Sequence, residues 1–500
     1  MNSVQRSIFF SASERYASLA LFFVSTAVLS RLLSPEEFGV YAVVTAVTSV
    51  FAASSQEFGG ANFLIQKTSL SDDNVRTAFT ITFGLSMVIA VALYVLGNVA
   101  GSMWGFEGLK SGISVAVLNF AITPFSMTII ALLRRNMQFG IIAASNFVCN
   151  VTMVGISIAL ATMKYSYLAP IWGMIAGSVV QMIYLMLTRK DLRIFKPSLL
   201  GYAEIIRFGV YSSGVVLINV FYSTAPQLFL ARMLDLAAVG LYSRAVNVTQ
   251  MFDKLVTQVI SPIIMPAIYA QTSKGGDLRR IYLHSVSLLT VLHWPFLTFM
   301  AVMAKPIILV WLGQSWLEVV PLIQLLCVGY LALFAACLTY PVLVAAGSVR
   351  DTLLSSLISL PPSLLITFWA SFFGVEAVAA SALLALPFQA AVAICFISRR
   401  LGLRFTDILH ATRKSAVVMM GSGAAAAICG TLVEYRLIGP VVGILISCIA
   451  TGAAWIAAVI ATRHPILPEL EAPAARVLSA FSRFAGIASV ATVKPNRDVR

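Results

Sequence analysis

The sequence predicts an all-α polytopic membrane protein. About fourteen transmembrane helices are expected, as two six-helix lobes related by a parallel repeat around a central cavity, plus two C-terminal helices. The 500 residues are 59% apolar and only 11% charged, whereas a soluble domain carries about 25% charged residues. Apolar stretches of roughly 20 residues, each long enough to cross a bilayer, follow one another along almost the whole chain. A gapless internal repeat and an alternating distribution of Lys and Arg complete the prediction.

The expected spans follow directly from the apolar stretches, and the joints between them carry helix-start signals. Ser34 provides an N-cap and Pro35 a first helical residue, and two carboxylates follow at the positive end of the helix dipole. Asp235 is expected to cap the corresponding helix of the second copy, and the stretch 71–73 the third span. The spans are expected at 12–33, 38–58, 78–100, 111–133, 141–162, 168–188, 210–231, 237–262, 281–303, 321–346, 352–373, 376–398, 415–433 and 438–461.

The internal repeat relates residues 29–41 to residues 230–242, with an offset of 201 residues. Both copies share Leu, Arg, Leu, Gly and Tyr at the same places, and both lie at the joint between two apolar stretches. Six spans separate the copies, so both halves enter the membrane in the same direction, and the repeat axis lies along the membrane normal. Two similar bundles flanking a central path are typical of transporters.

The repeat divides the chain into five parts. Spans 1 to 6 form one lobe and spans 7 to 12 the other, joined by a basic, amphipathic linker that is expected to lie on the cytoplasmic side. Spans 13 and 14 have no partner in the repeat, and a basic cytoplasmic tail follows them. The predicted boundaries are 1–188, 189–209, 210–400, 401–461 and 462–500.

The net charge of +14 reflects topology and does not indicate nucleic-acid binding. With the N-terminus inside, 26 of the 34 Lys and Arg residues fall on cytoplasmic joints and seven on the outer side, while Lys254 lies within a span. This split fits the positive-inside rule. It predicts a multi-pass protein with both termini in the cytoplasm.

The sequence lacks the usual enzyme signatures. It has no phosphate-binding glycine-rich loop, no HExxH and no GxSxG, and its four His do not cluster at metal-ligand spacing. Its six Cys are scattered singly. We therefore expect no catalytic residues, no metal and no cofactor, and we expect any transport to be driven by a gradient.

Polar residues follow helical spacing along one face of the expected span 237–262. Lys254 is the central one, and a Lys at mid-bilayer costs at least about 2.5–3.5 kcal/mol on insertion scales, so it should face protein or water. One interpretation is a hydrated cationic wall for an anionic substrate. The alternative is a structural pairing of Lys254 with Asp253 or with Glu57. The substrate-site candidates on this face are Arg244, Asn247, Gln250, Lys254 and Gln258.

The repeat-equivalent Arg31 and Arg232 are further candidates for the substrate site, near the outer ends of spans 1 and 7. The alternative is that each simply favours the negative end of its helix dipole and reaches the lipid headgroups. Four more charged residues lie in or beside spans and are candidates for a gate or for ion coupling, with structural ion pairing or solvation as the alternative. They are Glu14, Arg15, Glu57 and Asp253.

The segment 31–41, with the sequence Arg-Leu-Leu-Ser-Pro-Glu-Glu-Phe-Gly-Val-Tyr, resembles a joint of the Wzx-type oligosaccharide flippases. The Gly-Leu-Tyr at 240–242, followed by Pro262 and Pro266, carries the same resemblance in the second half. These flippases belong to the multidrug/oligosaccharidyl-lipid/polysaccharide superfamily. The resemblance covers spans 1 to 12 and implies two six-helix lobes around a V-shaped cavity that alternates in access.

The resemblance also implies a function. It suggests an inner-membrane protein that flips polyprenyl-diphosphate-linked oligosaccharide repeat units for exopolysaccharide or lipopolysaccharide biosynthesis. Membrane lipid, a pathway polymerase and glycosyltransferases are the implied partners. Two alternatives stay open: a lipid II flippase or cation-coupled drug exporter with the same fold, and a membrane glycosyltransferase or polymerase.

Overall fold

The computed structural model describes residues 3–58, 60–67, 69–104, 107–189, 192–257, 277–334, 339, 342–343 and 348–468, and these residues form helices and short connections without strands. Ten helices in this part of the chain are long and apolar enough to cross a membrane. The predicted class, an all-α polytopic membrane protein, is confirmed. The number of fourteen spans stays a prediction.

The first half of the chain is a series of antiparallel helices joined by short turns. A capping box begins the second helix, since the Glu37 amide donates to Ser34 Oγ and the Ser34 amide donates to a Glu37 carboxylate oxygen. The stretch predicted as one span at 111–133 is two consecutive helices that meet at Val117. The helices are α1 (Ser3–Leu32), α2 (Pro35–Phe58), α3 (Ala61–Gln66), α4 (Asp72–Trp104), α5 (Glu107–Ala116), α6 (Leu118–Arg135), α7 (Phe139–Thr162) and α8 (Leu168–Thr188).

The second half begins earlier than the sequence predicts. A 3₁₀ turn, η1 (Leu192–Phe195), follows α8, and α9 starts at Tyr202, inside the stretch predicted as linker. Gly201 precedes α9 with a φ of 74°, a conformation that glycine adopts without strain. The start of α9 is tied to the first half by an ion pair between Glu204 and Lys67, with 2.7 Å between nitrogen and oxygen.

Several helices of the second half are short or interrupted. Asp235 caps α10 as predicted, because its carboxylate accepts a hydrogen bond from the Ala238 amide. The span predicted at 237–262 is broken, since α10 ends at Thr249 and a π-helical turn follows. The elements are α9 (Tyr202–Met233), α10 (Leu236–Thr249), η2 (Asp253–Thr257), α12 (Leu278–Val302), α13 (Ala304–Trp311), η3 (Gln314–Trp316), α14 (Val319–Tyr330), η4 (Leu331–Leu333), α17 (Val349–Ala370), α18 (Val375–Leu401), α19 (Phe405–Glu434) and α20 (Pro440–Ala461).

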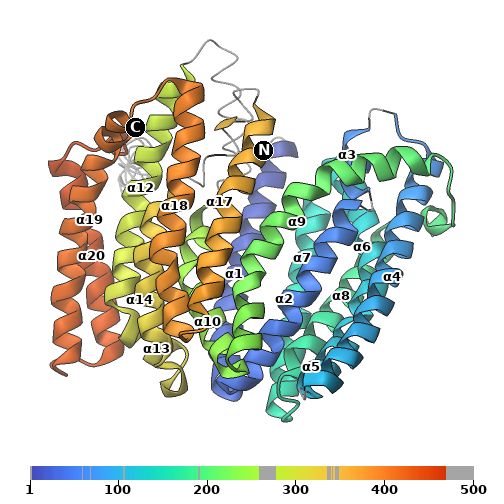
Figure 1. Cartoon of the computed structure of the whole chain (residues 1–500), viewed down its shortest axis with the longest axis horizontal. Coiled ribbons are helices and arrows are strands. Elements are labelled where there is room, and N and C mark those ends of the chain that lie inside the picture. The colour runs from blue at the N-terminus through green and yellow to red at the C-terminus, as the bar shows by residue number, and fades with distance from the viewer. Residues whose placement is uncertain are drawn as a thin grey trace, which may run out of the picture.

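The helices form two groups (Figure 1). The elements α3 to α8 lie on one side and α12 to α20 on the other, with α1, α9 and α10 between them. Helix α2 packs against both α9 and α10, and the hairpin of α19 and α20 packs at the far edge against α12. The largest hydrophobic core joins both groups, because it includes Ile171 of α8, Val239 of α10 and Leu322 of α14.

Candidate functional site

The two copies of the repeat meet backbone to backbone where α2 and α10 begin. A Cβ atom on Gly39 would overlap the carbonyl oxygen of Leu236, and one on Gly240 would overlap the carbonyl oxygen of Pro35. Both obstacles are main-chain atoms, which cannot rotate away as a side chain can. The repeated glycine is therefore what allows the two halves to close against each other at this end. We call this contact the glycine junction.

Helix α1 adds three more links between the halves. The Trp316 indole donates to the Ser30 carbonyl at 2.7 Å, and the Trp311 indole donates to the Phe23 carbonyl at 3.1 Å. Arg31 donates from Nη2 to the Val310 carbonyl at 2.9 Å. All three bonds end on main-chain carbonyls, so they fix the position of α1 against α13 and η3.

Arg244 lies one helical turn after the glycine junction. It is only 4% exposed, and its guanidinium carbon is 3.7 Å from the centre of the Phe38 ring and 5.3 Å from that of Trp316. Its Nε and Nη2 make no hydrogen bond with any described residue. The aromatic faces offset part of the cost of burying this cation, but its N–H donors remain unused. Arg244 therefore presents two N–H groups, Nε and Nη2, without an acceptor among the described residues.

Lys254 lies farther along the same element, in the π-helical turn η2. Its Nζ donates to Asn247 Oδ1 at 3.0 Å and lies 4.2 Å from the centre of the Phe22 ring of α1. Gln250 donates from Nε2 to the Tyr330 hydroxyl at 3.0 Å. A single π-helical turn inside an α-helical region is often found at functional sites. The predicted polar face thus contacts α1 and α14, on opposite halves of the chain.

If Lys254 has a structural role in place of a binding role, its ammonium should form an ion pair with the carboxylate of Asp253 or Glu57. Among the described residues Lys254 makes no ion pair, although its sequence neighbour Asp253 is half-buried in the same turn. The side chain of Glu57 and the whole of Gln258 lie outside the described residues. The partner observed for Lys254 is an amide oxygen and not a carboxylate.

The remaining candidates are dispersed. Glu14 accepts a hydrogen bond from Ser18 Oγ at 2.9 Å, and Ser18 in turn accepts one from Asn150 of α7 at the same distance. Arg15 is half-buried beside it. Arg232 is exposed, with no hydrogen bond or ion pair to the described residues, unlike its repeat equivalent Arg31. The two equivalent Arg residues are therefore not used symmetrically.

Sequence reasoning did not identify the aromatic residues that contact Arg244, Gln250 and Lys254. Phe22, Phe38, Trp316 and Tyr330 come from four separate elements, and no spacing in the sequence brings them together. The position of Phe38 directly before the repeated Gly39 is the one available signal.

Arg244 is the one buried Lys or Arg among the described residues, and Lys254 is half-buried. Every Asp and Glu whose side chain is described is at least partly exposed. A polar face with one buried and one half-buried cation, and no buried carboxylate among the described residues, favours an anionic ligand over a cationic one.

The fold defines the class first. The structure superposes on a solved lipid II flippase, MurJ in an inward closed conformation, with a TM-score of 0.73 over 91% of this chain and 99% of that one, at 12% identity. It also superposes on a multidrug transporter of the MATE family in its inward-facing conformation, with a TM-score of 0.62 over 78% and 94% of the two chains, at 13% identity. The chain therefore has the fold of the transporters of the MOP superfamily.

The sequence then gives the family. Residues 28–321, more than half of the chain, match the family described as polysaccharide biosynthesis protein, and the chain belongs to this family. It is 26% identical over 318 residues to the lipopolysaccharide biosynthesis protein WzxC of Escherichia coli, covering 62% of this chain and 63% of that protein. It is 23% identical to the succinoglycan biosynthesis transport protein ExoT of Rhizobium meliloti, covering 65% of each. Both matches span less than two thirds of the relative.

Proposed function

We propose that this protein is a non-enzymatic transporter that flips a polyprenyl-diphosphate-linked oligosaccharide across the bacterial inner membrane, for exopolysaccharide or lipopolysaccharide biosynthesis. Membership of the polysaccharide biosynthesis family and the transporter fold support this proposal. So do the relatives, whose names place them in lipopolysaccharide and succinoglycan biosynthesis.

The observation that carries the proposal is the buried cationic face of α10 and η2. A diphosphate that leaves water without partners loses many kcal/mol of hydration free energy, so a path for it needs cations with free donors. Arg244 offers unused N–H groups, and Lys254 offers a charge held by one amide oxygen and one ring face. In this proposal both residues bind the diphosphate while the sugars occupy the central cavity.

The glycine junction supplies the outer gate in this mechanism. It closes the halves at the end where α2 and α10 begin, which the distribution of Lys and Arg predicts to be the periplasmic side. The substrate then enters from the cytoplasmic leaflet, binds near Lys254 and Arg244, and leaves when the junction separates. This is alternating access: the two halves have an inward-open and an outward-open arrangement, and substrate binding shifts the equilibrium between them.

A cation-coupled drug exporter is the less favoured function, because the described residues bury no carboxylate for a cationic drug. A lipid II flippase shares the diphosphate chemistry, so the two flippase functions differ only in the sugar that they carry. The experiment must therefore show which lipid-linked sugar is carried, in addition to whether transport occurs.

Complementation provides this test. The gene is expressed in one strain that lacks its repeat-unit flippase and in another that lacks its lipid II flippase, and surface polymer and survival are scored. Restored surface polymer in the first strain, lost again in a Lys254→Ala variant that accumulates in the membrane normally, is the expected result. Rescue of the second strain alone would instead identify lipid II as the substrate.

The proposed topology has a separate test. Single cysteines are introduced into a protein whose six native Cys are removed, at exposed Tyr435 between α19 and α20 and at exposed Leu199 before α9. A membrane-impermeant thiol reagent is expected to label the first site in intact cells and the second only after lysis. Labelling of the Leu199 site from outside would invert the orientation.

A further inference from the structure

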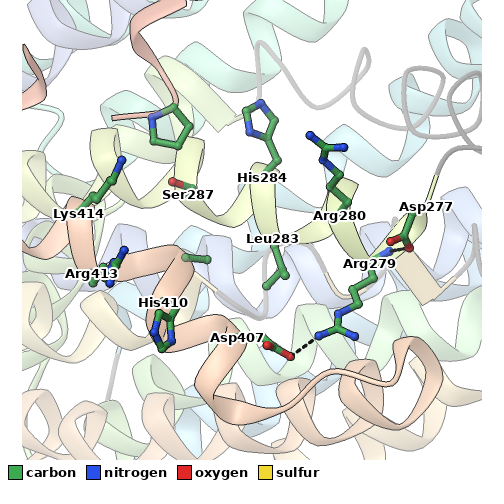
Figure 2. Close-up of a pocket in the computed structure, with 12 residues that line it drawn as sticks. Asp277, Arg279, Arg280, Leu283, His284, Ser287, Asp407, His410, Arg413 and Lys414 are labelled. Atoms are coloured by element: carbon green, nitrogen blue, oxygen red, sulfur yellow. Dashed lines mark hydrogen bonds and ion pairs between the residues drawn. The ribbon is translucent and has the colours of Figure 1, made fainter. Parts of the chain in front are cut away.

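A second cationic site lies away from the central path, in the peripheral hairpin that the repeat does not explain. A cavity of about 590 Å³ opens where α12 and α19 begin, beside the segment that follows α20 (Figure 2). Its charged and titratable walls come from the beginnings of both helices. They are Asp277, Arg279, Arg280 and His284 at the start of α12, and Asp407, His410, Arg413 and Lys414 from α19. We call this the α12–α19 pocket.

Three polar contacts hold the walls of the pocket in place. Arg279 Nη2 lies 2.8 Å from Asp407 Oδ2, and Figure 2 shows these side chains pointing toward each other across the gap between the helices. Asp407 also accepts a hydrogen bond from the Arg404 amide at 2.8 Å. Lys414 donates from Nζ to the Arg463 carbonyl at 2.7 Å, which joins α19 to the segment after α20. The cavity therefore has a built frame from three separate segments.

A buried, polar and uncharged cluster lies behind Ser287, which lines the pocket, and we call this cluster the floor. Ser287 Oγ and Ser415 Oγ lie 3.2 and 3.1 Å from His464 Nε2, and His464 is only 1% exposed. Burial lowers the pKa of His464 to about 4, and the nearby charges of Lys414 and His284 act in the same direction. The floor thus stays neutral at physiological pH, so the charge of the pocket is set by its walls.

The walls carry an excess of positive charge. Four Lys and Arg residues face two carboxylates, those of Asp277 and Asp407. Asp277 is engaged as the N-cap of α12, because it accepts a hydrogen bond from the Arg279 amide at 3.0 Å. Arg280 and Arg413 are exposed and make no hydrogen bond or ion pair with the described residues. Two guanidinium groups are therefore available to an anion, for which their planar forks are well suited.

The pocket also borders the lipid-facing surface. Phe405 and Leu409, in the first turns of α19, are 69% and 58% exposed, as expected of side chains that face lipid tails. Leu283, Ala411 and Pro465 add apolar wall to the same cavity. A water-soluble anion gains little from apolar walls, whereas a lipid presents a charged headgroup and apolar chains to the two kinds of surface.

We propose that the α12–α19 pocket binds the phosphate-bearing headgroup of an anionic lipid, as a site separate from the substrate path. Arg280 and Arg413 contact the phosphate, the ion pair of Arg279 with Asp407 maintains the spacing of the helices, and the acyl chains lie along α19. The basic residues have a simpler explanation in the positive-inside rule, which requires charge but no pocket. The two explanations differ in whether a particular pair of Arg residues selects a lipid.

The test compares two double variants of the full-length protein purified in detergent. Arg280→Gln with Arg413→Gln removes the two free cations of the pocket. Arg134→Gln with Arg399→Gln removes two Arg that are also exposed, from helix ends outside the pocket. Each protein is titrated with phosphatidylglycerol, with phosphatidylcholine and with inorganic diphosphate, and bound molecules are counted by native mass spectrometry. Thermal unfolding verifies that all three proteins are folded.

The expected result is a preference of the unmodified protein for phosphatidylglycerol over phosphatidylcholine. A Lys or Arg near an anionic lipid surface strengthens binding roughly fivefold, so the pocket variant should bind phosphatidylglycerol roughly 25-fold more weakly. The control variant should bind it unchanged. Equal losses in both double variants, or no loss in the pocket variant, would overturn the site. Tight binding of inorganic diphosphate that the pocket variant loses, without selectivity for phosphatidylglycerol over phosphatidylcholine, would overturn the assignment to a lipid. Neither outcome bears on the proposed transport activity.

Discussion

Helices α2 and α10 begin as copies of each other and then diverge. They share Gly39 and Gly240 at the junction, and Thr48 and Thr249 donate to the carbonyls four residues earlier in the same way. Two positions after the shared Tyr, however, α2 has Val43 and α10 has Arg244. The same 201-residue offset pairs Ala46 with Asn247 and Ala53 with Lys254, so two more apolar residues of the first copy correspond to polar residues in the second.

This comparison separates two roles along one helix. The shared residues form the contact between the halves, because a symmetric interface needs the same small residue on both sides. The residues that differ place the buried Arg244 and the half-buried Lys254 on the second half alone. We infer that the halves close symmetrically but bind their substrate asymmetrically. The four predictions below test that division, from the largest expected effect to the smallest.

Gly240→Val tests the shared part of the repeat. The new side chain would overlap the Pro35 carbonyl, which the backbone of α2 holds in place, and overpacking of this kind costs roughly 1–3 kcal/mol or more. Export of polymer should fall by about a hundredfold, and Gly39→Val should be equally damaging. Gly84→Val of α4, where a Cβ meets no neighbouring atom, is the matched control. Normal export by a well-inserted Gly240→Val protein would remove the junction from the transport cycle.

Lys254→Ala tests the residues that differ between the two copies of the repeat. Loss of the charged donor should lower export by roughly tenfold or more, since a hydrogen bond to a charged group contributes about 1.5–3 kcal/mol. Lys254→Arg should retain part of the activity, because the charge remains while its shape changes. Export is measured as surface polymer, with protein accumulation as the control. A drop in accumulation that neutralising Asp253 or Glu57 repairs would point to a structural role instead.

Arg244→Met distinguishes binding from stability. Burying an unpaired cation is costly, so its apolar replacement should leave the unfolding temperature unchanged or raised, while export falls by about tenfold. Val43→Met, at the equivalent place on α2, removes no cation but adds volume to a core position that is only 3% exposed, so it should lower the unfolding temperature instead. Both are measured by thermal unfolding in detergent and by surface polymer. A destabilised Arg244→Met protein that exports normally would show that Arg244 stabilises the fold and does not bind substrate.

Arg31→Ala and Arg232→Ala are expected to have the smallest effects on export, and the two effects should differ. Arg31→Ala removes the bond to the Val310 carbonyl, which at this exposed position contributes up to about 1 kcal/mol, so export should change by at most about fivefold. Arg232→Ala should have no measurable effect, because Arg232 has no bond to the described residues. Equal losses in the two variants would restore a symmetric role for the pair at the outer mouth.

The sequence by itself determined the class of this protein and its repeat. Long apolar stretches must be helical in a bilayer, where backbone groups have no water to bond, so composition alone predicts an all-α membrane protein. The helix caps at Ser34 and Asp235 followed from local chemistry, and both are confirmed. The polar face from Arg244 to Lys254 was visible for the same reason, because helical spacing is a local property.

Only the tertiary structure decided what those residues contact. The rings of Phe38 and Trp316 flank Arg244 from positions far apart in the chain, and the α12–α19 pocket depends on how a peripheral hairpin packs. The break in the span 237–262 was also missed, because the π-helical turn at Lys254 leaves no mark in the periodicity. Packing between distant segments is set by shape and by main-chain contacts such as those of Gly39 and Gly240, and a linear pattern of polarity does not encode these.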